Sequence, residues 1–208
     1  MLKRFFTSYW SIPIVLIVVI GCNMMAIYLL NSMIHETPHR NTCPSNLKQI
    51  ALGIMMYSQD YDDKLPPAIF GGETVGWVSG LQPYLRSYQI FQCPADQHEP
   101  PNDPHLPGFT DYWMNQNAAK VDLYKLEGEP GKMILLGDGD GASPASTASY
   151  AINELPASWL QSSDSPARRH VDGANYAFVD GHVKWLKPED ISQETPVRNN
   201  NMYTFHVK

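Results

Sequence analysis

Residues 174–186 read Ala-Asn-Tyr-Ala-Phe-Val-Asp-Gly-His-Val-Lys-Trp-Leu. Two runs of strand-forming character, 174–179 and 182–186, flank the dipeptide Asp180-Gly181. An Asp-Gly pair between two such runs is the strongest short-range signal of a β-hairpin, because glycine tolerates the positive φ of a type I′ turn. The sequence therefore predicts an antiparallel hairpin with a two-residue turn at Asp180-Gly181.

A helix is predicted upstream of this hairpin, with Thr42 or Cys43 as its N-cap and Pro66-Pro67 at its end. Apolar side chains recur there at the spacing of a helix face, while charged and amide side chains lie largely off that stripe. The stripe consists of Leu47, Ile50, Ala51, Ile54, Tyr57, Ser58 and Tyr61.

Shorter elements are expected along the rest of the chain. Residues 77–88 have the pattern of a second helix, and residues 132–136 and 202–207 have strand character. Seventeen prolines and fourteen glycines indicate many turns between short elements. The predicted fold class is α+β, with a helix packed on a small antiparallel β-sheet.

The N-terminus is predicted to anchor the chain in a membrane. Two basic residues precede the stretch 9–30, which contains no charged side chain. At about 1.5 Å per residue a helix of that length reaches roughly 33 Å, and the hydrocarbon core of a bilayer is about 30 Å thick. The predicted organisation is a transmembrane anchor over 1–34, a polar hinge over 35–42 and an exported head over 43–208, with the N-terminus in the cytoplasm.

A cleaved signal peptide is the alternative interpretation of this segment. Val19-Ile20-Gly21-Cys22 fits the lipobox pattern, in which the cysteine becomes lipidated. Residues 24–30 remain apolar, however, whereas a mature lipoprotein usually continues with a polar tether. Both interpretations tether the protein to a membrane.

Cysteine usage agrees with export. Cys22 lies inside the predicted anchor, which leaves Cys43 and Cys93 as a pair in the head. In an oxidising compartment two such thiols most simply form a disulfide. Neither has the Cys-x-x-Cys spacing of a redox or zinc site.

Four motifs follow one another along the chain. They are Cys43-Pro-Ser-Asn46-Leu47-Lys48-Gln49, Phe91-Gln-Cys93-Pro94-Ala-Asp96, Tyr112-Trp-Met-Asn115, and His170 followed after nine residues by Asp180-Gly181-His182. In these motifs the chain resembles the prepilin-like (pseudopilin-like) proteins of type II secretion and type IV pilus systems, in the form abundant in planctomycetes. The resemblance implies a pilin-like fold, in which a long N-terminal helix packs on an antiparallel sheet, and a role in filament or secretion-apparatus assembly.

The N-terminus departs from the prepilin pattern. It has no glycine at the cleavage position and no glutamate in the apolar stretch. Pro38 and Pro44 are also expected to interrupt the single continuous helix of pilins, because each disfavours helix at the preceding residue. A static anchored relative is therefore predicted rather than a filament subunit.

Two sets of residues are candidate metal ligands. Asp138 and Asp140 could offer carboxylate oxygens to Ca²⁺, and the alternative is a glycine-rich turn with solvated side chains. His170, Asp180 and His182 could form a metal or acid–base cluster, and the alternative is turn chemistry at Asp180 with His170 bracing the hairpin.

The sequence thus predicts a non-enzymatic structural or assembly protein of the inner membrane, with its head in the periplasm or at the cell surface. The expected partners are the cytoplasmic membrane and other pilin-like or secretion-system subunits. A net charge of −6 without a basic run argues against nucleic acid as a partner. No cofactor other than Ca²⁺ is expected. The alternatives are a lipid-anchored envelope binding protein and a metal-dependent hydrolase.

Overall fold

The structure of the protein is a computed structural model that describes residues 11–70, 75–96, 98–125, 129–197 and 202–207. The chain divides into two compact units, Met1–His39 and Arg40–Lys208. We call the second unit the head, and each unit is described by itself.

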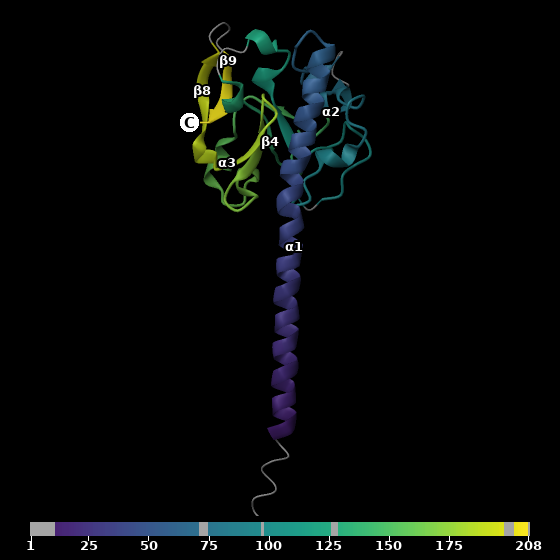
Figure 1. The fold of residues 1–208 in the computed structure, drawn as a ribbon, viewed down its shortest axis with the longest axis vertical. Coiled ribbons are helices and arrows are strands. Elements are labelled where there is room, and N and C mark those ends of the chain that lie inside the picture. The colour runs from purple at the N-terminus through teal and green to yellow at the C-terminus, as the bar shows by residue number, and fades with distance from the viewer. Residues whose placement is uncertain (1–10, 71–74, 97, 126–128, 198–201, 208) are drawn as a thin grey trace, which may run out of the picture. The chain divides into compact units, whose positions relative to one another are not determined.

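The head contains a five-stranded sheet and two strand pairs (Figure 1). The order in the large sheet is β5-β3-β4-β6-β7, and all neighbours are antiparallel except β3 and β5, which are parallel. The α+β class is therefore confirmed, but the sheet is mixed rather than purely antiparallel. In chain order the helices and strands are α1 (Ser11–Asp60), β1 (Ile69–Phe70), β2 (Val75–Gly76), α2 (Trp77–Gly80), β3 (Tyr112–Asn115), β4 (Ile134–Asp138), β5 (Ala151–Ile152), α3 (Ala157–Gln161), β6 (Ala174–Phe178), β7 (Val183–Leu186), β8 (Ile191–Val197) and β9 (Met202–Val207).

The first unit contains the N-terminal part of α1. Its large apolar side chains between Ile14 and Leu30 are all exposed. The predicted membrane span begins at residue 9, outside the described residues. Among the described residues, no helix combines the length and the apolarity needed to cross a bilayer, so the predicted transmembrane helix is not supported by the structure.

The predicted break in α1 is wrong. The helix runs from Ser11 to Asp60 through both Pro38 and Pro44, and no separate helix begins at Cys43. A proline inside a helix removes one N–H donor and crowds the carbonyl of the preceding turn, but around Pro44 the helix face from Cys43 onward is held by burial in the head. Tertiary packing there outweighs the local preference.

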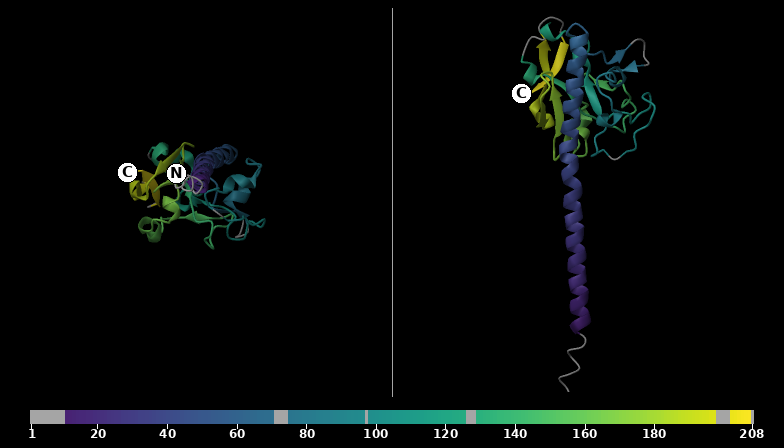
Figure 2. Two further views of the ribbon diagram at one scale, coloured as in Figure 1. Left: turned by 90° about the horizontal axis from the view of Figure 1, so that it is seen from below. Right: turned by 45° about the vertical axis from the view of Figure 1, so that its right-hand side comes forward.

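The three central strands of the large sheet, β3, β4 and β6, are buried on both faces. Alternate residues of β3 point in opposite directions, so that Tyr112 and Met114 join one core and Trp113 joins the other. The first core includes the buried face of α1, with Leu47, Ile50 and Ile54 fully buried. The second core lies under α3 and the pair β8–β9, whose yellow strands stand beside the sheet in both views of Figure 2. The strand Ile191–Val197 was not predicted from the sequence.

The predicted hairpin is confirmed, but its turn is longer than expected. Strands β6 and β7 pair in antiparallel register, from Ala174 with Leu186 to Ala177 with Val183. The N–H of Gly181 donates to the carbonyl of Phe178, and the Phe178 N–H donates to the carbonyl of His182. Within the loop 179–181 only Gly181 has a positive φ, of 82°, so this is a three-residue loop with a glycine bulge rather than a type I′ turn.

Two further predictions were only partly right. The second helix is a single short one, α2, which ends at Gly80, and a 3₁₀ turn follows only at Tyr88–Phe91. The run 137–141 is not wholly a turn, because strand β4 continues through Asp138, which is fully buried.

One turn of α1 is joined to two distant segments of the head. Cys43 and Cys93 form a disulfide with their Cα atoms 5.2 Å apart, as predicted. The Asn46 amide donates to the carbonyl of Gln92 at 2.9 Å. The Lys48 ammonium donates to the carbonyl of Gly181 at 2.5 Å, so the same turn also contacts the loop of the β6–β7 hairpin.

Replacing Cys43 and Cys93 together by alanine should lower the stability of the head. The bond joins residues 50 apart, and closing a loop of about that length stabilises by roughly 4 kcal/mol on the chain-entropy estimate. Urea unfolding followed by tryptophan fluorescence measures the loss. Reductant should cause the same loss of stability in the wild type and leave the stability of the double variant unchanged. If the oxidised wild type and the double variant are equally stable, the prediction is contradicted.

Candidate functional site: a polar cluster beside the disulfide

Polar side chains from five segments meet next to the disulfide, inside an otherwise apolar head. Two of the four sequence motifs contribute to this cluster, since Asp96 belongs to the second motif and His170 to the fourth. We call this group the polar cluster, and it comprises Asp96, His98, Asp111, Asp138, Arg169, His170 and Asn175.

His170 and Asp138 form the inner half of the cluster. His170 Nε2 lies 3.5 Å from the Cys93 sulfur and 3.3 Å from Asp138 Oδ2. The same Asp138 oxygen accepts from the backbone N–H of Asn175 at 2.6 Å and from its side-chain amide at 3.1 Å. This half joins the end of β4 to the start of β6 beside the disulfide.

Asp111, which directly precedes β3, stands at the centre of the cluster. Its Oδ2 accepts from the Cys93 N–H at 2.6 Å, while its Oδ1 has no hydrogen-bond partner among the described residues. Burial raises the pKa of Asp111 to about 7, although the Cys93 N–H and the nearby His98 and Arg169 favour its ionised form. Burial of a carboxylate costs free energy unless an opposite charge or hydrogen-bond donors compensate for the water it has lost.

Asp96, His98 and Arg169 form the outer half. Arg169 Nη2 donates to Asp96 Oδ2 at 2.6 Å. His98 Nε2 is 2.9 Å from the Gly108 carbonyl and 3.5 Å from Asp111 Oδ1. Desolvation lowers the pKa of His98, but the Gly108 carbonyl, Asp111 and Asp96 together outweigh it and the net shift is upward.

The backbone at Gly141 closes over the outer half. Its N–H is 3.2 Å from Asp96 Oδ2. A Cβ built at this position would overlap Asp111 Oδ1 and lie 2.5 Å from His98 Cε1 and 3.0 Å from Asp96 Oδ2. A side chain at position 141 would therefore fill the space between the three residues.

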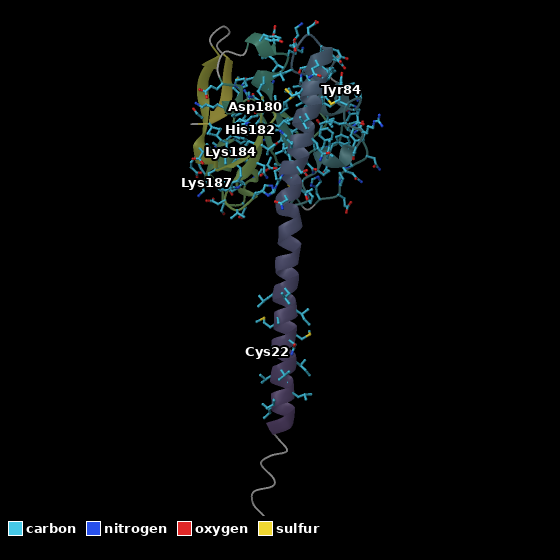
Figure 3. The ribbon with its side chains drawn as sticks, viewed as in Figure 1. Cys22, Tyr84, Asp180, His182, Lys184 and Lys187 are labelled. Carbon is cyan, nitrogen blue, oxygen red and sulfur yellow. A yellow bond between two sulfur atoms is a disulfide. The ribbon has the colours of Figure 1, made fainter. Side chains whose placement is uncertain are left out.

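The structure does not assemble His170, Asp180 and His182 into a metal-binding group within the ranges it describes. His170 is buried, whereas Asp180 and His182 form an exposed pair, with His182 Nδ1 2.5 Å from Asp180 Oδ1 (Figure 3). The His182 ring also stacks on Phe178, with centroids 4.1 Å apart. These contacts are the turn chemistry that was the alternative to a metal cluster.

For Asp138 the interpretation as a solvated turn residue is wrong, and Ca²⁺ binding by the Gly-Asp run stays a prediction. This carboxylate is not solvated, and its Oδ2 is used by Asn175. Asp140 Oδ1 accepts from the N–H of Ala142 at 3.0 Å. No candidate group of metal ligands in the described part of the chain includes either aspartate.

The other motif residues hold the surroundings in place. Asn115 is buried, donates to the Ile134 carbonyl at 2.9 Å and accepts from the Asn117 N–H at 3.0 Å. Leu47 is part of the core, whereas Gln49 is exposed and its amide donates to the Ser45 carbonyl in the preceding turn.

Sequence reasoning missed His98, Asp111 and Arg169. The loop containing His98 looked exposed because proline, aspartate and asparagine dominate it. Asp111 and Arg169 each directly precede a motif residue, Tyr112 and His170, and adjacency to a motif was the only local signal available.

Comparison with known families gives one match. The sequence model of the family described as "Protein of unknown function (DUF1559)" matches residues 36–142, just over half of the chain. The chain belongs to this family. The match to the DUF1559 family includes the disulfide, Asp96, His98, Asp111 and Asp138, and it ends before the motif that begins at His170. No curated protein and no solved structure matches the chain.

Replacing Asp138 by alanine should destabilise the head far more than replacing Asp140. The first change leaves two buried Asn175 donors without an acceptor, at about 1–3 kcal/mol each, so we expect a loss of about 3 kcal/mol or more. Asp140→Ala removes one partly exposed contact and should cost about 1 kcal/mol or less. Urea unfolding of both variants measures the difference, and equal losses would show that the inner half of the cluster is not structurally important.

Proposed function

We propose that this protein is a pilin-like structural or assembly protein of the bacterial envelope. In this proposal the N-terminal apolar segment tethers it to the cytoplasmic membrane and the head lies on the oxidising side. Its partners are further pilin-like or secretion-system subunits, and it acts as a static anchored component rather than as an enzyme.

The observation that carries the proposal is the apolar surface of α1 between residues 14 and 30. Every large apolar side chain in this segment is exposed, from 51% for Val19 to 71% for Tyr28. Figure 3 shows side chains around Cys22 pointing away from the helix on both sides. A helix that is apolar all round is normally covered by lipid or by other protein.

Two features of the head support the same proposal. The disulfide between Cys43 and Cys93 is typical of a compartment outside the cytoplasm. The continuous helix Ser11–Asp60, whose later turns contribute to a core against a β-sheet, agrees with the long N-terminal helix that the pilin-like resemblance implies.

Two acidic residues in the apolar segment should release the protein from membranes. Leu16→Asp with Ile20→Asp places charges one helical turn apart, and each costs about 2.5–3.5 kcal/mol at the centre of a bilayer. Leu52→Asp with Met56→Asp is the matched control, because these apolar residues have the same spacing on the same helix and are similarly exposed, at 48% and 50%.

Membrane fractionation with carbonate extraction measures the effect. The wild type and the control variant should remain with the membranes, and the first variant should not. A wild-type protein that is recovered free of membranes would reject the tether. Intact mass spectrometry then separates the two anchors, because loss of residues 1–21 together with a lipid-modified Cys22 at the new N-terminus would replace the retained helix by the lipoprotein alternative.

Oxidation of native membranes should cross-link two copies through Cys22 if the proposed assembly includes this segment. Cys22 is a free, exposed cysteine, whereas Cys43 and Cys93 are already bonded to each other. Non-reducing electrophoresis should show a covalent dimer that is absent from Cys22→Ser. A wild type that stays monomeric under oxidant would argue against packing of copies along this helix.

A further inference from the structure

We propose that Asp96, His98 and Asp111 form a binding site for a divalent transition-metal ion of the Zn²⁺ type in the head. The site goes beyond the proposed function and does not depend on it, because all three ligands lie in the head and none contributes to the apolar segment.

The first argument is distance. Each of the three residues can offer one ligand atom such that all three atoms lie within 4.8 Å of one another. They come from two segments that are joined by a hydrogen bond, since Cys93 lies three residues before Asp96 and its N–H donates to Asp111 at 2.6 Å. The three groups are therefore close enough for one ion to contact them all after small side-chain adjustments.

The second argument is the orientation of the His98 ring. Its Nε2 is 2.9 Å from the Gly108 carbonyl, and because a carbonyl only accepts, Nε2 carries the hydrogen. The buried Nδ1 then has no hydrogen-bond partner among the described residues, and the nearest carboxylate oxygen on Asp96 is 3.7 Å away. A histidine that donates one ring nitrogen to a backbone carbonyl and leaves the other facing a carboxylate, here that of Asp96, has the arrangement usual for metal ligands.

The third argument is the unused oxygen of Asp111. The residue is fully buried, and Oδ1 has no partner among the residues that the structure describes. The distance of 3.5 Å from Oδ1 to His98 Nε2 is too long for a good hydrogen bond. The Nε2 hydrogen is already directed at the Gly108 carbonyl, which lies 2.9 Å away. A buried carboxylate oxygen without a donor is unfavourable, and coordination of a cation would remove that cost.

The backbone leaves room for an ion only because residue 141 is glycine. A Cβ there would meet all three ligands. The outer side of the site opens onto a cavity of about 410 Å³, which Asp96 and His98 line together with Asn46 and Gln92. The cavity provides an entry path for the ion and water for the remaining coordination positions.

The donor set decides the class of ion. One imidazole nitrogen and two carboxylate oxygens, with water completing the shell, suit Zn²⁺ and related transition metals. Ca²⁺ needs six to eight oxygen ligands and does not favour imidazole. Arg169 neutralises part of the charge by binding Asp96 Oδ2, which leaves Oδ1 of Asp96 for the ion.

Zn²⁺ binding to the full-length protein in detergent, with any affinity tag removed and after treatment with chelator, tests the proposal. Isothermal titration should show one Zn²⁺ per chain. His98→Ala should weaken binding by more than about 100-fold, since loss of even an outer-shell partner costs about 10- to 100-fold. Asp111→Asn should weaken binding similarly while keeping the shape of the side chain.

His182→Ala is the matched control, because His182 also contacts an aspartate but lies in the exposed pair on the hairpin. It should bind Zn²⁺ as the wild type does. Circular dichroism of His98→Ala shows whether its head remains folded. If it does not, the Zn²⁺ titration of Asp111→Asn tests the site instead. The proposal is overturned if the wild type takes up no Zn²⁺, if Ca²⁺ binds more tightly than Zn²⁺, or if a folded His98→Ala binds like the wild type.

Discussion

The covalent bond between Cys43 and Cys93 is the constraint on which the head depends. It fixes one turn of α1 against the loop that carries Asp96, and hydrogen bonds from Asn46 and Lys48 extend the same attachment to Gln92 and to the β6–β7 hairpin. A single helical turn therefore positions two segments that are far apart in the sequence. The polar cluster forms where these segments meet, which explains why motifs spread over the chain converge there.

The polar cluster is unusual because several of its buried polar atoms have no hydrogen-bond partner in the described structure. In the inner half, Oδ2 of Asp138 has donors from Asn175 and lies next to His170, whereas Oδ1 of the same residue has none among the described residues. At the centre and in the outer half, Asp111 Oδ1, His98 Nδ1 and Arg169 Nη1 are likewise without a described partner. Buried polar groups in folded proteins are nearly always paired, so a ligand that contacts Asp111 and His98 together would remove part of this cost.

The apolar segment of α1 poses a different requirement. Within the head, one apolar face of the helix is covered by the first core, and the exposed side chains include both polar residues such as Gln49 and the apolar residues Leu52 and Met56. Between residues 14 and 30 the same helix carries exposed apolar side chains throughout. The two parts of one helix therefore require different surroundings, and this difference is the physical basis for proposing a tethered protein with a folded head.

The sequence alone determined the features that follow from local chemistry. Alternation and an Asp-Gly pair specified the hairpin, apolar spacing identified the helix face of the head, and cysteine usage identified the disulfide. It misjudged the hairpin turn because Val179 joins the loop, and it misjudged the start of the head's helix because burial of the helix face from Cys43 onward outweighs Pro44. Only the tertiary structure decided that His170 meets Asp138 instead of Asp180 and His182, and that His98, Asp111 and Gly141 enclose one small space. These residues lie in loops and at strand ends, and packing of the sheet brings those segments together. No periodic pattern in the sequence predicts which of these segments will be in contact.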